Sequence, residues 1–384
     1  MDALADHLRQ QVQAHGNWIG FDDFMQSALY WPGLGYYTGG GRPFESDYVT
    51  APMLGPWLGQ AVWKMSAALR TESLFRIREF GGGRGDLAAS FMACAQEEPV
   101  PQLKMEMVEL SADLAEQQRR TTQGLGPIEW LSRVEEGFTG LVVANEVLDA
   151  MPVKRLEWRG DADVVEWGIG LEGDQFVWRE RPAAPEVIQA VLIREAAARR
   201  RDLPWAPGYC LEWCPWTAPW LASLAKSMET GAVVLIDYGY AERELDHPGR
   251  PQGTLCAHYR HQRFDAPEQW IARLGQQDLT AHVNFSQIAR EAQQAGFQVS
   301  GFVTQARFLM NMGLLDTVQA SLLTITDPLK RAKTLQGIKT VLMESEMGEV
   351  FKVMLLTKHL PPATCARLES AAFEAGDRRD SLML

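Results

Sequence analysis

The stretch with the clearest chemical potential is a glycine-rich loop. Residues 78–88 read REFGGGRGDLA, with four glycines in five positions. Glycines placed between an apolar run and a helix-like run let the backbone approach a ligand closely. The spacing Gly81-x-Gly83-x-Gly85 is the form used by enzymes that bind S-adenosylmethionine (SAM), whereas Gly83-x-Gly85-x-x-Ala88 fits the fingerprint for a dinucleotide pyrophosphate. The loop alone therefore predicts a nucleoside and leaves two cofactors open.

Acidic side chains beside this loop favour SAM. Asp86 follows the last glycine directly, where its charge would repel a pyrophosphate. Glu109 follows the next apolar run and can accept hydrogen bonds from both ribose hydroxyls, which either cofactor offers. Glu79 and Leu110 flank these positions, and we count them among the cofactor-binding residues. The sequence thus predicts a SAM site, with a NAD(P)-dependent oxidoreductase as the alternative.

Two later apolar runs also end in polar side chains. Residues 141–144 are followed by Asn145, Glu146 and Asp149, and the run 231–237 ends in Asp237 and is followed by Tyr238. In open α/β sheets, ligands bind outside the carboxyl ends of the strands. We therefore expect these side chains near the reacting group of the cofactor. For Asn145, capping of a helix is the alternative.

The alternation of strand and helix patterns defines the fold class. Strands are predicted near 74–80, 105–110, 128–134 and 141–144, with helices between the first three, which indicates a parallel, doubly wound sheet. The pattern then changes at residues 153–182 to three apolar runs separated by Gly/Asp turns, typical of an antiparallel meander. The parallel pattern resumes at 231–237, and residues 297–304 and 350–357 are predicted as the last strands. We predict an α/β Rossmann-like sheet with an N-terminal helical segment and an inserted antiparallel β/α subdomain.

Five segments follow from these patterns. They are an N-terminal helical segment rich in Gly and Tyr (1–70), the first half of the SAM-binding domain (71–151), the inserted subdomain (152–230), the second half with a helical insertion (231–360), and a C-terminal helix and tail (361–384). The insertion is rich in tryptophan. Its tryptophans either present a protein-docking surface or form a small aromatic core.

Composition limits the partners and the compartment. The 384 residues carry a net charge of -12, which argues against a nucleic-acid partner. No apolar run approaches the roughly 20 residues of a membrane span, so we expect no membrane insertion. Five scattered cysteines indicate free thiols, and their spacing indicates no metal site. Because the first residues show neither a signal nor a transit peptide, we expect a cytoplasmic protein.

Several motifs in order along the chain resemble the NDUFAF7/MidA family of class I, Rossmann-like SAM-dependent methyltransferases. They include GYYTGG, DYVTAP, EFGGGRGDL, VELSADLAEQQ, ANEVLDAMPV, VVLIDYGY, QGTLCAHYRH and QARFLMNMG. The resemblance covers nearly the whole length. It implies SAM as the cofactor, a protein substrate with arginine as the favoured methyl acceptor, and a link to the assembly of respiratory complex I.

The resemblance also implies roles for individual residues. Gly81, Gly83 and Gly85 would lie under the methionine part of SAM, Glu109 would hold its ribose, and Asn145 and Glu146 would lie near the methyl group. The residues expected to close over the cofactor are Tyr37, Asp47, Thr50 and Pro52.

For a guanidinium acceptor, carboxylates are the suitable partners, because they form bidentate pairs that fix its plane. We predict Glu146, Asn145, Asp149 and Asp237 as catalytic residues, with His282 as a base. Glu212 and Tyr238 are predicted to bind the substrate; for Asp149 and Glu212, bracing of loops through backbone hydrogen bonds is the alternative. A non-catalytic assembly factor that keeps SAM as a structural ligand, and a homodimer, remain open.

Overall fold

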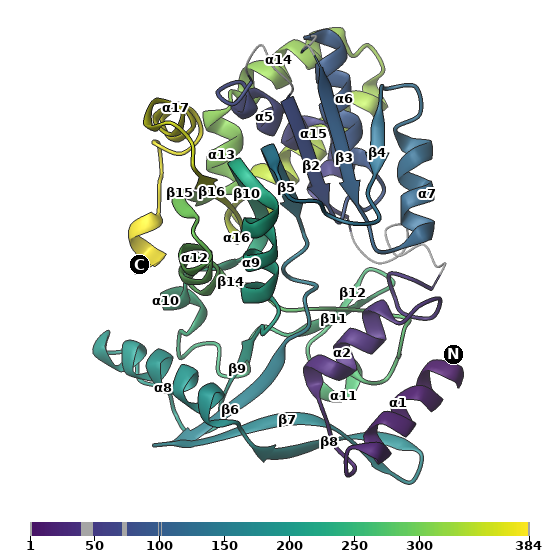
Figure 1. Cartoon of the computed structure of the whole chain (residues 1–384), viewed down its shortest axis with the longest axis vertical. Coiled ribbons are helices and arrows are strands. Elements are labelled where there is room, and N and C mark those ends of the chain that lie inside the picture. Colours follow the sequence, from purple (N-terminus) through teal and green to yellow (C-terminus); the bar gives the residue numbers. More distant parts are fainter. Residues whose placement is uncertain (1, 40–48, 71–74, 99, 101, 383–384) are drawn as a thin grey trace. The chain divides into compact units, whose positions relative to one another are not determined.

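Each of the two structural units of this protein is built from three separate stretches of chain (Figure 1). The computed structural model describes residues 2–39, 49–70, 75–98, 100 and 102–382. Unit 1 comprises Met1–Tyr48, Leu148–Pro219 and Tyr240–Ser286, and unit 2 comprises Val49–Val147, Trp220–Gly239 and Gln287–Leu384. The chain therefore leaves and re-enters each unit twice.

A twisted sheet forms the centre of unit 2. Its strands are β2 (Phe75–Phe80), β3 (Leu103–Val108), β4 (Ile128–Trp130), β5 (Phe138–Asn145), β10 (Met228–Tyr240), β15 (Gln298–Thr304) and β16 (Phe351–Lys358). They lie in the order β4-β3-β2-β5-β10-β16-β15. The chain steps outward from β2 to β4 and then returns to β5 on the other side of β2. Strand order therefore reverses between β2 and β5, and ligands bind at such a point.

The first five strands of this order pair in parallel, as predicted, but β16 is antiparallel to both of its neighbours. The sheet is therefore mixed. Phe351 at the start of β16 pairs with Tyr238 near the end of β10, so β16 enters the sheet from the edge at which the parallel strands end. The helices between β15 and β16 return the chain to that edge.

Helices cover the sheet of unit 2. They are α4 (Ala51–Leu54), α5 (Trp57–Ser66), α6 (Asp86–Glu97), α7 (Ala112–Thr121), α9 (Thr217–Ser227), α12 (Phe285–Gln294), α13 (Gln305–Asn311), α14 (Leu314–Thr324), α15 (Pro328–Leu342), α16 (Met347–Val350) and α17 (Pro362–Ala372), followed by a 3-10 turn, η1 (Arg379–Leu382). Val62 of α5 and Phe91 of α6 belong to one buried core with Ile77, Leu141 and Val234 of the strands. Parallel strands covered in this way are apolar, which explains the run GAVVLI in β10.

Strand β2 is more polar than a central strand usually is, and the structure gives the reason. Arg76 and Arg78 both reach the Glu106 carboxylate of β3, at 2.5 Å and 2.8 Å. Glu106 is fully buried and Arg78 is 1% exposed. Both guanidinium groups also lie over the Phe138 ring. A shared ion pair thus replaces apolar packing on this part of the sheet.

Unit 1 contains two antiparallel sheets. Its elements are α1 (Asp2–Ala14), β1 (Ile19–Gly20), α2 (Phe21–Tyr30), β6 (Lys154–Gly160), β7 (Asp163–Glu172), β8 (Gln175–Pro182), α8 (Pro185–Arg200), β9 (Tyr209–Trp213), α10 (Glu242–Leu245), β11 (Cys256–Tyr259), β12 (Gln262–Phe264), α11 (Pro267–Trp270), β13 (Asp278–Thr280) and β14 (Val283–Asn284). The larger sheet has the order β1-β7-β6-β9, with β8 on β7, and the smaller has the order β12-β11-β13. The predicted meander is β6-β7-β8.

Two buried clusters hold unit 1 together. One joins α1 and α2 to Ile169 of β7 and to Trp270 of α11. The other joins α8 to β6 and includes Trp158 and Trp205, whose rings meet edge to face at 6.2 Å. Trp205 also stacks on Tyr209 at 4.3 Å. Trp158 and Trp205 therefore form an aromatic core and not a docking surface.

The predicted fold class, an α/β Rossmann-like sheet with an inserted antiparallel subdomain, is confirmed. The units nevertheless combine segments differently from the five expected ones. Residues 49–70 contribute α4 and α5 to unit 2, and residues 240–286 belong with the meander in unit 1. Local sequence patterns do not encode which helix packs on which sheet, because that choice depends on contacts between distant segments. Across the part of the chain that the structure describes, no helix has the length and apolar character needed to cross a bilayer.

Candidate active site

The glycine loop joins the end of β2 to the start of α6. Gly81, Gly83 and Gly85 have φ angles of 59°, 52° and 90°, in the left-handed region that favours glycine. A Cβ on Gly81 would stand 2.9 Å from a methyl group of Val147. Ala88, the last position of the dinucleotide spacing, lies fully buried inside α6. The backbone angles therefore favour glycine at positions 81, 83 and 85, which is the spacing of SAM-binding enzymes.

Glu109 lies directly after β3 and is held in place by two donors. The backbone N–H of Ser111 donates to its Oε1 at 2.9 Å, and the Gln118 side-chain amide donates to its Oε2 at 2.9 Å. Burial raises the pKa of Glu109, and these two hydrogen bonds partly offset that effect. Leu110, the next residue, is 81% exposed. An apolar side chain left open beside a fixed carboxylate suits contact with a nucleoside.

Gln118 of α7 is a residue that the sequence interpretation missed. Its amide N–H₂ group also donates to the Gly83 carbonyl at 3.0 Å, and its Oε1 accepts from the Trp130 indole at 2.9 Å. The side chain is fully buried. It ties the glycine loop to Glu109. The sequence did contain a signal that Gln118 is buried. It lies three residues after Ala115 and four after Leu114, which places it on the buried face of the helix.

Glu79 lies at the end of β2 and is 2% exposed. Burial and, to a smaller extent, the nearby charges of Glu109 and Asp86 together raise its pKa to about 8. Its Oε2 has no hydrogen-bond partner among the residues that the structure describes. This site therefore holds a buried carboxyl group that can accept a hydrogen bond from a ligand.

Asn145 and Glu146 stand at the end of β5, next to the point where strand order reverses. The Asn145 amide donates to the Glu146 Oε1 at 3.1 Å, while its own Oδ1 is buried without a partner in the described part of the chain. Glu146 has a φ of 52°, an unfavourable angle for a residue with a side chain. Its backbone N–H donates to the Ile236 carbonyl at 2.8 Å, which holds this conformation.

Asp237 clamps the loops that follow β5 and β10. It is 1% exposed. Its Oδ2 accepts from the backbone N–H of Val147 at 3.2 Å, and its Oδ1 accepts from that of Tyr238 at 2.9 Å. The Tyr238 ring lies 5.4 Å from Phe351. With both oxygens engaged by backbone donors, Asp237 is placed to position the loop that carries Glu146.

Thr50 and Pro52 lie at the start of α4 in unit 2, and Thr50 is buried. Asp47, the other expected contact from this segment, lies outside the described residues. The remaining predicted residues are in unit 1. There the Tyr37 hydroxyl donates to Asp278 at 2.9 Å, and its ring stacks on Tyr30 at 5.5 Å.

Within unit 1, backbone and side-chain hydrogen bonds link Asp149, Glu212 and His282. The Asp149 carbonyl accepts from the N–H of Ala281 at 3.2 Å, and the next N–H, of His282, donates to the Thr254 hydroxyl oxygen at 3.0 Å. The Thr254 hydroxyl in turn donates to Glu212 at 3.0 Å. We call Tyr37, Asp149, Glu212 and His282 the unit 1 cluster.

Glu212 has a structural use. Besides the Thr254 hydroxyl, the backbone N–H groups of Thr254 and Leu255 donate to its carboxylate at 2.9 Å and 3.4 Å. Arg155 lies 3.6 Å away. A Cβ on Gly253 would stand 2.1 Å from the same carboxylate, so only glycine fits there. The carboxylate thus braces the loop between α10 and β11, the alternative that its position in the sequence left open.

The unit 2 residues fit SAM better than a pyrophosphate. The buried acceptors Glu79 and Asn145 suit the donors of an ammonium group and a ribose. Glu146 and Asp237 add negative charge beside the loop, which would repel phosphate groups but attract a sulfonium. No group of three or more His, Cys, Asp or Glu side chains among the described residues is arranged to hold a metal ion.

Comparisons with known proteins support SAM as the cofactor. A protein from Burkholderia thailandensis, whose crystal structure holds S-adenosyl-homocysteine, is 34% identical, with a TM-score of 0.85 over 99% of this chain and 96% of that one. The rat protein named "Protein arginine methyltransferase NDUFAF7, mitochondrial" is 26% identical over 92% of this chain and 84% of its own length. The human protein of the same name is 25% identical over 92% and 83%.

The names of these relatives correct one prediction. The relatives are named as mitochondrial proteins, which contradicts the predicted cytoplasmic location. That prediction depended on the composition of the first residues, which did not indicate the compartment.

The part of the chain that matches a family model includes both the glycine loop and the polar residues at the strand ends. A family model described as "Putative S-adenosyl-L-methionine-dependent methyltransferase" matches residues 53–303. This range includes all the predicted cofactor residues of unit 2 except Thr50 and Pro52. The chain belongs to this family of SAM-dependent methyltransferases.

Proposed function

We propose that this methyltransferase acts on an arginine side chain of a protein. The observation that carries the proposal is Glu146, a carboxylate held at the switch point of the sheet in a strained conformation and hydrogen-bonded to Asn145. A carboxylate can fix the plane of a guanidinium by two parallel hydrogen bonds. The names of the rat and human relatives, both protein arginine methyltransferases, support the same acceptor.

We further propose how the residues of unit 2 share the work. The backbone of Gly81, Gly83 and Gly85 passes under the methionine part of SAM, and Glu109 accepts hydrogen bonds from its ribose. SAM supplies an electrophilic methyl group on a sulfonium. Methyl transfer is an in-line displacement, so the main task of the protein is to position the acceptor nitrogen.

Glu146 then orients the acceptor and stabilises its positive charge, and Asn145 fixes the Glu146 carboxylate. Asp237 acts as a positioning residue, because it holds the backbone of the loop that carries Glu146. The proton that the acceptor nitrogen loses needs a base. His282 remains a prediction for that role, Asp149 for orienting the acceptor, and Tyr238 for contact with the substrate.

The test is transfer of a radiolabelled methyl group from SAM into a lysate from cells that lack the enzyme, followed by mapping of the modified residue. We expect Glu146→Gln to lower transfer at least a hundredfold and to keep SAM binding within about threefold by calorimetry. Gly83→Val should abolish both. Glu116→Gln, a change of an exposed glutamate on α7, is the matched control and should leave both unchanged.

Each result has a distinct meaning. Methylation of lysine or of a carboxylate would overturn the arginine acceptor. Full transfer by Glu146→Gln would overturn the role of that carboxylate. SAM binding without transfer into any protein would identify a non-catalytic SAM-binding factor. A homodimer stays a prediction, which light scattering of the full chain would test.

A further inference from the structure

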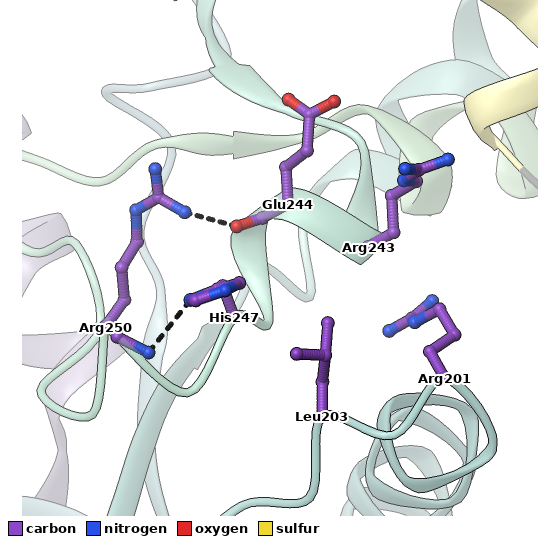
Figure 2. Close-up of a pocket in the computed structure, with 7 residues that line it drawn as sticks. Arg201, Leu203, Arg243, Glu244, His247 and Arg250 are labelled. Atoms are coloured by element: carbon purple, nitrogen blue, oxygen red, sulfur yellow. Dashed lines mark hydrogen bonds between the residues drawn. The ribbon is translucent and has the colours of Figure 1, made fainter.

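A basic pocket in unit 1 has no part in the proposed reaction. It is an open surface hollow of about 900 Å³, lined by Arg201, Leu203, Arg243, Glu244, His247, Gly249 and Arg250 (Figure 2). The ionised lining residues, three arginines and one glutamate, give it a net charge of +2 in a chain whose net charge is -12. Sites for organic ligands typically enclose about 300 to 1,000 Å³. The pocket therefore has the size and the charge for an anionic organic molecule.

A buried ion pair fixes the two walls of this pocket to each other. Arg201 ends helix α8, whereas Arg243 and His247 belong to α10 and the loop that follows it. Arg194 of α8 donates to the Asp246 carboxylate, with its Nε at 2.9 Å, and both side chains are nearly inaccessible. Two further hydrogen bonds support this arrangement. The Trp205 indole donates to the Asp246 carbonyl at 2.9 Å, and the Tyr209 hydroxyl donates to the His247 carbonyl at 3.3 Å. The pocket is thus a prearranged feature of unit 1.

Its donors are also preorganised. One guanidinium nitrogen of Arg250 donates to the Glu244 carbonyl, and the group lies 4.4 Å from the Tyr240 ring. The backbone N–H of Gly249 donates to Nδ1 of His247 at 3.0 Å. Nδ1 therefore carries no proton, so the neutral ring carries its proton on Nε2 and can donate there.

Among the pocket arginines, Arg243 and Arg250 meet little competing negative charge. Figure 2 shows the Glu244 carboxylate pointing away from Arg201 and Leu203. Within the described ranges, no carboxylate forms an ion pair with Arg243 or Arg250. Guanidinium groups bind phosphate through paired hydrogen bonds, and three of them supply enough charge for more than one phosphate group.

We propose that this pocket binds a phosphorylated small molecule, whose phosphate groups are held by Arg201, Arg243 and Arg250. The rest of the ligand lies against Leu203 and the backbone at Gly249. The loop that carries Gly249 and Arg250 continues to Thr254, which hydrogen-bonds to Glu212 and His282. A bound ligand therefore also stabilises the loop to which the unit 1 cluster is attached.

The test is calorimetry of the full chain with inorganic phosphate, pyrophosphate and a hexaglutamate peptide. We expect one pyrophosphate per chain, with inorganic phosphate weaker. Arg243→Glu should weaken pyrophosphate binding at least tenfold, and Arg243→Lys should give an intermediate loss. The matched control is Arg200→Glu, because Arg200 is exposed on the same turn of α8 as the pocket wall but does not line the pocket. It should change the affinity less than twofold.

Binding of S-adenosyl-homocysteine serves as the measure of folding and should be unchanged in all three variants. Four results would overturn the proposal: no saturable binding of pyrophosphate, equal losses from Arg243→Glu and Arg200→Glu, competition between pyrophosphate and S-adenosyl-homocysteine, or tighter binding of hexaglutamate than of pyrophosphate. The last result would assign the pocket to an acidic segment of a protein.

Discussion

Carboxyl groups around the glycine loop experience very different surroundings. Asp237 receives two backbone hydrogen bonds, Glu109 receives one from the backbone and one from an amide, and Glu79 has a buried oxygen without a partner in the described chain. Stabilisation of the charged form decreases in that order. Of these three carboxyl groups, Glu79 is therefore the one whose ionisation destabilises the folded state most.

This cost leads to a pH-dependent prediction. The pKa of Glu79 is about 8 in the folded protein and ordinarily 4.5, so the folded state binds more protons between those values. Its contribution to the free energy of unfolding therefore falls as pH rises through this window. Glu79→Gln removes the effect, and we expect the variant to gain about 3 to 5 kcal/mol relative to the wild type between pH 4 and pH 9.

Urea unfolding of the SAM-free protein at several pH values measures this difference. Glu116→Gln, on the exposed side of α7, should show no such trend. A stability difference for Glu79→Gln that stays constant with pH would contradict the prediction.

Gln118 carries the second prediction at this scale. Gln118→Ala removes the donor to both Gly83 and Glu109, and each buried hydrogen bond lost in this way costs about 1 to 3 kcal/mol. We expect affinity for S-adenosyl-homocysteine to fall about tenfold or more by calorimetry. Gln123→Ala, an exposed residue just past the same helix, should leave it unchanged. Equal affinities for both variants would show that Gln118 does not position the loop.

At the scale of elements, β2 and β3 depend on one carboxylate. Glu106 is shared by Arg76 and Arg78, and its removal leaves the buried Arg78 guanidinium without a counter-charge. We expect Glu106→Gln to lower the free energy of unfolding by about 3 to 5 kcal/mol. Glu129→Gln breaks the exposed pair with Lys104 on the adjacent strand and should lower the free energy of unfolding far less. Chemical denaturation measures both, and similar costs would contradict the assigned role of the buried pair.

The elements themselves were well predicted where the pattern was strong. Helices α1, α2 and α7, the central strands and the meander follow from periodicity and turn residues. The short strands β9 and β11 to β13 were not predicted, because they pair with segments far away in the chain and have little periodicity of their own. The antiparallel direction of β16 was not predicted either, because it depends on the path of the helices before it.

At the scale of the whole molecule, each unit has its own buried core, so we expect each to unfold as a separate cooperative unit. Leu156→Ala in β6 and Leu141→Ala in β5 are a matched pair of fully buried changes. Each should cost about 2 to 5 kcal/mol. Hydrogen exchange should increase in β6 to β9 for the first variant and in β2, β5 and β10 for the second. Equal increases in both units for either variant would contradict separate unfolding.

The sequence by itself determined the fold class, the glycine spacing and the strand-end acids, because each is a local property. A left-handed backbone angle favours glycine, and a polar residue after an apolar run marks the end of a strand. The tertiary structure decided the use of each acid. Asp237 and Glu212 accept backbone hydrogen bonds from segments 90 and 42 residues away, and the Arg194–Asp246 pair helps to join the two walls that carry the arginines of the basic pocket. Such pairings depend on packing between distant segments, which local patterns do not specify.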